Sequence, residues 1–191
     1  MNRLNSAILL LMTLLLAGQP PGSAQEAAAS RYELPNRDTL ELLVPPNWDA
    51  TVDQPDDGGS PTIELRAREG ASFEIYITPD WPDAPDEAVP DAETLRETVR
   101  GAAERIRSQV VEENLEIRRL QGASGVGFYF VATERAPQPE EFKYMNQGEL
   151  QVGELTLTFT ILTNDGQEAI VEEAFAMLSR AVHRNTGLDQ R

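Results

Sequence analysis

The sequence contains no cysteine and a single histidine, His183, within its 191 residues. Without thiols the chain can form no disulfide, carry no lipid on cysteine and use no cysteine nucleophile. One histidine and no cysteine also leave too few of the usual ligands for a zinc site. A serine triad would need Ser108, Ser124 or Ser179, and none of these lies in a nucleophile-elbow sequence. We therefore expect no enzymatic activity and no cofactor, with His183 solvated near a helix C-terminus.

Basic residues are half as frequent as acidic ones. The 16 Lys and Arg residues stand against 32 Asp and Glu residues, and the formal net charge is −16. Such a chain is repelled by nucleic-acid phosphates and by anionic lipid headgroups. We expect no nucleic-acid partner, and we expect the charge to favour solubility. Cations or basic partners are one interpretation of the charge, but the ordinary acidity of exported soluble proteins is the better explanation.

One long apolar run, Ala7–Ala17, follows the basic Arg3 and is too short to span a bilayer comfortably. Small residues at Gly22 to Ala24 offer a cleavage site. The pattern predicts a signal peptide over residues 1–24 that is cleaved after Ala24, and hence a protein of the periplasm or the exterior without a stable membrane anchor. The alternative is an uncleaved anchor.

The rest of the chain predicts one domain. Residues 25–30 are rich in alanine and are expected to be a flexible N-terminus, residues 31–184 hold the structured elements, and residues 185–191 form a tail that should fray. About 170 residues bury enough surface to fold without disulfides.

The stretch Phe142–Leu162 predicts a β-hairpin at the centre of the sheet, because apolar residues alternate with threonines in its second arm. Gly153-Glu154 suits a two-residue type II′ turn. We expect a glycine opposite Phe159 to leave room for the aromatic ring. The turn sets three pairs: Val152 with Leu155, Leu150 with Leu157, and Gly148 with Phe159.

Alternating apolar residues and turn formers predict six further strands and two helices with apolar stripes. Asp91 or Thr94 is expected to cap the first helix, and Asp165 the second. The order ββ-ββ-α-ββ-ββ-α predicts an α+β fold, with a mostly antiparallel sheet of about eight strands packed against helices on the same face or on opposite faces. The expected elements are strands at Tyr32–Leu34, Thr39–Val44, Thr62–Ala67, Ala71–Thr78, Leu115–Leu120 and Val126–Thr133, and helices at Asp91–Glu113 and from Asp165 to about Val182.

Two loops rich in acidic residues are candidate calcium sites, because Ca²⁺ takes carboxylate and carbonyl oxygens from flexible loops. Neither spacing matches an EF-hand, and the alternative for both is an exposed acidic turn. The first loop, Asp49–Pro61, carries Asp49, Asp53, Asp56 and Asp57. The second, Pro79–Pro90, carries Asp80, Asp83, Asp86 and Glu87.

Two tryptophans are candidate partner-binding residues. Trp48 follows a strand that Pro45-Pro46 ends, and it is expected to fold back on the sheet edge. Trp81 stands among prolines in a loop, where it either anchors a partner or packs on its own scaffold. We expect an apolar patch or an open groove near Trp48, Trp81 or the loop Pro137–Glu141.

The order of elements over Arg31–Arg184 resembles the PsbP/Mog-type α/β/α sandwich superfamily, which includes the bacterial DcrB-like exported proteins. The resemblance is carried by the step from Pro45 to Trp48, the strand Gly125–Phe130 and the hairpin around Gly153. It implies a non-enzymatic binding or accessory protein of the cell envelope with a protein or peptide partner, and it transfers no binding residues. Unlike the lipoprotein members, this chain has no lipid-bearing cysteine. The alternative function is a small-ligand or calcium carrier that uses the loop Asp49–Asp57.

Overall fold

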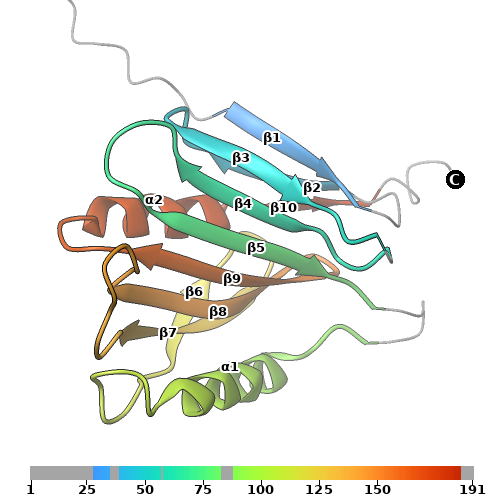
Figure 1. Ribbon diagram of the computed structural model, residues 1–191. Helices are drawn as coiled ribbons and strands as arrows, with labels where there is room; N and C mark the ends of the chain where they lie inside the picture. The colour runs from blue at the N-terminus through green and yellow to red at the C-terminus, as the bar shows by residue number, and fades with distance from the viewer. Residues whose placement is uncertain (1–27, 35–38, 57, 83–87, 186–191) are drawn as a thin grey trace, which may run out of the picture.

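The computed structural model describes residues 28–34, 39–56, 58–82 and 88–185. These residues form ten strands and two helices in an α+β arrangement (Figure 1). Along the chain they are β1 (Ala28–Glu33), β2 (Thr39–Val44), β3 (Trp48–Asp53), β4 (Thr62–Ala67), β5 (Glu74–Asp80), α1 (Ala92–Ile106), β6 (Arg118–Gln121), β7 (Val126–Thr133), β8 (Tyr144–Val152), β9 (Leu155–Thr163), α2 (Glu168–Ser179) and β10 (Val182–Arg184).

The strands form two antiparallel sheets. The large sheet has the order β3-β4-β5-β9-β8-β7-β6, and the small sheet has the order β1-β2-β10. The α+β class and the mostly antiparallel pairing are therefore confirmed, whereas the single sheet of about eight strands is wrong. The prediction missed β3, whose side chains after Trp48 are all exposed, and β10, which has three residues. Neither strand carries the alternation of buried and exposed residues that marks a strand in sequence.

The predicted hairpin is confirmed. β8 and β9 pair in the expected register, with Val152 opposite Leu155 and Gly148 opposite Phe159. Gly153 has φ +64° at the first loop position, as a type II′ turn requires. β9 is the fourth of seven strands, so the hairpin lies at the centre of the large sheet.

The reason for a glycine at position 148 differs from the one expected. A Cβ atom at Gly148 would meet the carbonyl oxygen of Phe128 and would lie 2.6 Å from Cβ of Tyr129, both on the neighbouring strand β7. The close approach of β7, rather than the Phe159 ring alone, therefore requires the glycine.

The two helices cover opposite faces of the large sheet. Phe130 of β7 packs in a cluster with Val99 and Ala103 of α1. The neighbouring residue Tyr129 points to the other face, where its ring lies 4.6 Å from that of Phe175 on α2. Since successive side chains of a strand point to opposite faces, α1 and α2 lie on different sides of the sheet.

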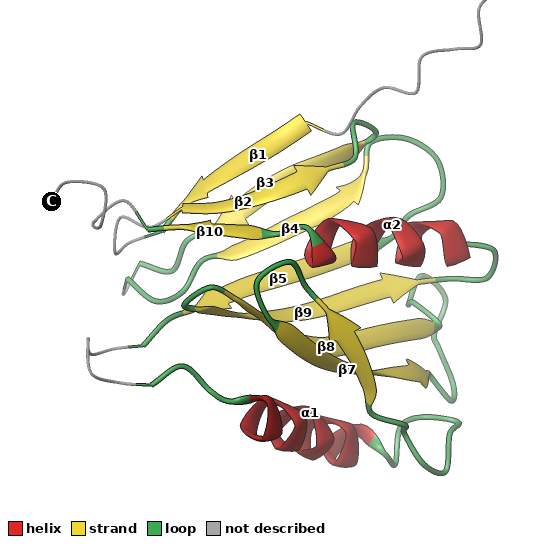
Figure 2. Ribbon diagram, turned by 180° about the vertical axis from the view of Figure 1, so that it is seen from behind, coloured by secondary structure: helices red, strands yellow, loops and turns green. Residues whose placement is uncertain are grey.

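The main core lies between the large sheet, the small sheet and α2. It joins Leu40 and Leu42 of β2 to Phe159 of β9 and Leu178 of α2, all fully buried. Figure 2 shows α2 and the small sheet on the same side of the large sheet, whereas α1 lies beyond β7. Among the described residues, no helix is long and apolar enough to cross a membrane.

The ends of several elements differ from the predicted ones. Asp91 caps α1 as expected, because its Oδ1 accepts a hydrogen bond from the Thr94 amide at 2.8 Å. The helix ends at Ile106 rather than Glu113, and Val110 instead bridges to Glu134. The helix prediction failed there because Val110 still falls on the apolar stripe, although its burial comes from packing outside the helix.

Two other predicted boundaries are wrong. Ala28–Ser30, expected to be flexible, belong to β1 and pair with Leu42–Val44. Pro79 and Asp80, expected in a loop, end β5, where Pro79 pairs with Leu157 beyond the last pair of β5 with β4. The predicted signal peptide over residues 1–24 and the tail residues 186–191 lie outside the described residues.

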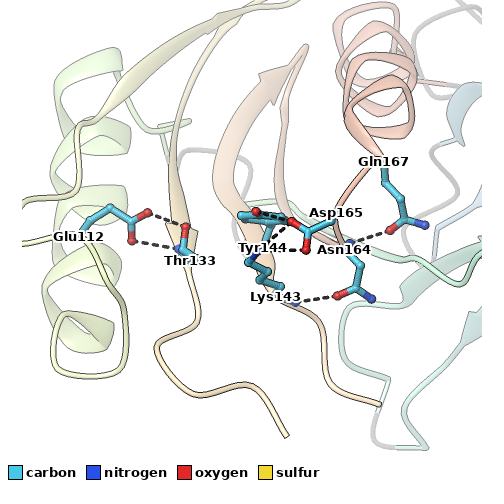
Figure 3. Close-up of polar contacts among 7 residues, drawn as sticks. All are labelled: Glu112, Thr133, Lys143, Tyr144, Asn164, Asp165 and Gln167. Atoms are coloured by element: carbon cyan, nitrogen blue, oxygen red, sulfur yellow. Dashed lines mark hydrogen bonds and ion pairs between the residues drawn. The ribbon is translucent and has the colours of Figure 1, made fainter. Parts of the chain in front are cut away.

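A chain of polar contacts fastens the start of α2 (Figure 3). Gln167 takes the N-cap position predicted for Asp165, which instead accepts hydrogen bonds from Lys143 Nζ at 2.8 Å and from the Tyr144 hydroxyl at 2.7 Å. Gln167 is 7% exposed; its Oε1 accepts from the Asn164 amide at 2.7 Å, and its Nε2 donates to the Ser72 carbonyl at 3.0 Å. This side chain therefore joins the loop between β4 and β5 to the turn between β9 and α2.

Replacing Gln167 by alanine is expected to lower the free energy of unfolding by about 1.5 kcal/mol, because it leaves the buried groups that Gln167 satisfies without partners. Urea denaturation at neutral pH measures the change. Gln109→Ala removes an exposed glutamine and should change stability by less than about 0.5 kcal/mol. Equal losses in the two variants would contradict this role of Gln167.

Candidate functional site

A cleft of about 230 Å³ opens between the first half of α1, the end of β5 and the β8–β9 hairpin. We call it the Trp81 cleft. Three carboxylate residues, Asp80, Glu149 and Glu154, line it together with Trp81. Hydroxyl groups come from Thr98 of α1 and from Thr156 and Thr158 of β9. Of the described residues, those that line the cleft include no lysine, arginine or histidine.

The strand register builds the floor of this cleft. Glu149 of β8 lies opposite Thr158, and Asp80 of β5 lies opposite Thr156 from the other side of β9. Residues directly opposite each other in neighbouring strands project to the same face. The two residues therefore flank the threonines of β9 on one face, with Cα atoms roughly 12 Å apart, because they are separated by two strand spacings and by two residues along β9.

Neither Asp80 nor Glu149 has an ion-pair partner among the described residues. Other acidic residues of the protein do: Glu41, for example, accepts from Arg31 and from Arg184. Burial in the cleft, and to a smaller extent the charge of Asp80, raises the pKa of Glu149 above its ordinary value. Glu154 differs, because its Oε2 accepts a hydrogen bond from Asn185 Nδ2 at 3.2 Å. The cleft thus holds acidic side chains, Asp80 and Glu149, that no basic residue in the described part of the chain pairs with.

Replacing Glu149 by glutamine is expected to stabilise the protein at neutral pH. The raised pKa means that the folded state binds this proton more tightly than the unfolded state, so stability is largest below the ordinary pKa of 4.5 and falls as pH rises through the folded pKa. Glutamine removes that loss. We expect a melting temperature about 1–2 °C higher than wild type at pH 7 and little difference at pH 4.

Thermal unfolding of the variant and of wild type at both pH values measures this effect. Glu172→Gln makes the same change of charge at an exposed position of α2 and should not reproduce it. A gain at pH 4 as large as that at pH 7 would show that the raised pKa is not its source.

The two candidate tryptophans lie in different environments. Trp81 is half-buried: it lines the cleft and also packs against the main core. Packing on its own scaffold is thus present, whereas the role of partner anchor stays a prediction. Trp48 is only 3% exposed, and its ring centroid lies 4.8 Å from that of Phe73. Trp48 lies at the sheet edge, but as the first residue of β3, a strand that was not predicted. Its side chain enters the core and offers no surface to a partner.

The acidic stretch Asp49–Asp57 is mostly strand rather than loop. Asp49 and Asp53 stand at the two ends of β3, about 13 Å apart along an extended chain, and Asp49 pairs with Arg68 at 2.9 Å. Asp56 follows the strand, while Asp57 lies outside the described residues. Within residues 28–34, 39–56, 58–82 and 88–185, no three acidic or histidine side chains gather in a way that could hold a metal ion. Of the second acidic loop, Asp80 belongs to β5, and Asp83, Asp86 and Glu87 lie outside the described residues.

His183 and Ser124 both lie at the turn between β8 and β9. Nδ1 of His183 accepts a hydrogen bond from the Glu154 amide at 3.3 Å, and Oγ of Ser124 accepts one from the Gly153 amide at 3.1 Å. The histidine belongs to β10 rather than to a helix end, so the predicted helix-dipole environment is wrong. Its contact links the small sheet to the hairpin of the large sheet.

A second cleft of about 190 Å³ lies beside the C-terminal half of α1. Its two arginines are engaged within the protein: Arg100 pairs with Glu97, and Arg107 donates to the Glu113 carbonyl. The loop Pro137–Glu141 lines neither of these two clefts. The Trp81 cleft therefore offers the better set of uncommitted side chains.

The fold and the cleft together define an α+β protein with an acidic cleft that an aromatic side chain lines. No family model matches the sequence, and no curated protein matches it. One solved structure that is similar is the solution structure of cyanobacterial PsbP (CyanoP) from Synechocystis sp. PCC 6803. It is 13% identical, the TM-score is 0.48, and the match covers 86% of this chain and 97% of that one.

Proposed function

We propose that this protein is a non-enzymatic binding or accessory protein of the bacterial cell envelope that holds a segment of a partner polypeptide in the Trp81 cleft. The supporting observation is the combination of a half-buried tryptophan with unpaired carboxylates in one open cleft. Aromatic side chains partly held by their own scaffold are frequent anchors of interfaces. We also propose that the protein is exported through a cleaved signal peptide and that it is related to the DcrB-like exported proteins.

The size of the cleft favours a polypeptide segment over an enclosed metabolite. Pockets for small molecules measure roughly 300–1,000 Å³ and are mostly apolar. The Trp81 cleft is smaller, at about 230 Å³, and carboxylates and hydroxyls form much of its wall. Such a space suits one side chain of a longer partner, with the rest of the partner lying across the surface.

Selection from a displayed library of random peptides tests the proposal. Peptides enriched on the wild-type protein are expected to bind the Trp81→Ala variant at least about tenfold more weakly, a loss typical of an interface anchor. Val111→Ala is the matched control, because Val111 is 56% exposed and lies outside the cleft. Enriched peptides that bind both variants equally, or no enrichment at all, would refute this function for the cleft. Melting temperatures of the variants confirm that each is folded.

A further inference from the structure

The uncommitted charge of the Trp81 cleft restricts the chemistry of what enters it. Asp80 and Glu149 come from β5 and β8, and Thr98 of α1 also lines the cleft. Glu154 of the hairpin turn adds a third carboxylate. An anion or a neutral apolar group would leave these carboxylates desolvated without compensation. A cation would supply the missing partner.

The desolvation is already visible in the free protein. Glu149 is half-buried, and burial raises its pKa. A positive charge placed near it compensates the burial and favours the ionised carboxylate. Binding of a cation and ionisation of Glu149 are therefore coupled.

The arrangement suits an organic cation better than a metal ion. Asp80 and Glu149 lie on either side of β9, and among the described residues no three acidic or histidine side chains gather in a way that could hold a metal ion. Trp81 and Pro82 also line the cleft. An ammonium or guanidinium group interacts favourably with the face of an indole ring, and its methylene stem packs on apolar walls.

We propose that the Trp81 cleft selects a lysine or arginine side chain of the partner polypeptide, which Glu149 and Asp80 bind by charge and Trp81 by its ring. This inference rests on the proposed function and names the chemistry of its ligand. The methylene stem of either residue fills the narrow cleft, and the backbone on both sides of it continues over the protein surface.

Nuclear magnetic resonance of the ¹⁵N-labelled protein tests this selectivity. The probes are the capped tripeptides acetyl-Ala-Lys-Ala-amide and acetyl-Ala-Arg-Ala-amide, with the norleucine tripeptide as an uncharged match. The indole N–H signal of Trp81 should shift and saturate with the basic peptides, with a Kd on the order of millimolar for so small a contact. The signal of the core residue Trp48 should not move. The norleucine peptide should bind at least about fivefold more weakly than the basic peptides.

Glu149→Gln should weaken binding of the basic peptides about fivefold, whereas Glu172→Gln should leave it unchanged, although both variants lose one negative charge. Equal binding of the norleucine peptide, or equal losses in the two variants, would overturn the inference. So would a stronger response of Trp81 to calcium chloride or to cadaverine than to the peptides, since these report a metal or a free amine. Library peptides that need Trp81 but bind Glu149→Gln as well as wild type would overturn the cation selectivity and leave the proposed binding function standing.

Discussion

Replacement of Phe159 by alanine is expected to lower the free energy of unfolding by about 4 kcal/mol, the cost typical of deleting a buried phenylalanine ring. Phe159 is fully buried at the centre of the large sheet, and its ring meets that of Phe175 edge-on at 6.1 Å. The small sheet and α2 close over the same cluster, so several elements would have to move to fill the cavity. Urea denaturation followed by tryptophan fluorescence measures the change.

The control is the neighbouring residue Thr158, which is exposed on the opposite face of β9. Thr158→Ala should change stability by less than about 0.5 kcal/mol. A loss below about 2 kcal/mol for Phe159→Ala would mean that the core collapses around the gap, and that α2 is less firmly docked than its contacts indicate.

Replacement of Gly148 by alanine is expected to lower the free energy of unfolding by about 3 kcal/mol, although it adds one methyl group. That methyl group would lie 2.6 Å from Cβ of Tyr129 and would also meet the Phe128 carbonyl oxygen. Backbone atoms of an inner strand cannot turn aside as the end of a flexible side chain can. β7 and β8 must separate, and overpacking of this kind destabilises by about 1–3 kcal/mol or more.

Replacing Gly101 by alanine is expected to have the opposite effect on stability. In α1 an added Cβ would meet only Nη1 of Arg105, at 3.7 Å, which is an ordinary contact. Because alanine favours the helix by about 1 kcal/mol over glycine, Gly101→Ala should raise the melting temperature. Thermal unfolding of the two variants side by side measures both effects, and a neutral Gly148→Ala would show that β7 and β8 have room to adjust.

The hairpin could be predicted in detail because its signals are local. Alternation in β9 fixes which side chains face inward, and the glycine at the turn fixes the register. The cap at Asp91 is equally local, since its side chain reaches an amide three residues away. What the sequence alone did not reveal is why position 148 is glycine, because that depends on β7, twenty residues earlier.

The elements that were missed depend on distant partners. β3 has too few apolar residues to be recognised, and its pairing with β4 alone makes it a strand. β10 forms because β2 accepts it as a neighbour. The division into two sheets follows from these pairings. The alternation of residues within one segment does not show which strand that segment pairs with.

Part of the candidate site was visible in the sequence. Trp81 stood out as an aromatic residue among prolines, and Asp80 as an acid beside it. Glu149 did not, because in sequence it is one polar residue of an alternating strand, between Gly148 and Leu150. The available signal was the predicted register of the hairpin, which also implies that Glu149 lies opposite Thr158 on the polar face. Its nearness to Asp80 required the pairing of β9 with β5 as well.

The open edge of β3 gives the acidic composition a role in keeping copies of the protein apart. An unpaired strand edge is a template on which another copy can add its own edge. If two β3 strands paired head to tail about Thr51, Asp49 of each copy would face Asp53 of the other. Asp49 is already paired with Arg68, so the two Asp53 carboxylates would contribute most of the repulsion that opposes pairing at this edge. Concentrated salt, which screens such repulsion, removes the protection without touching the fold.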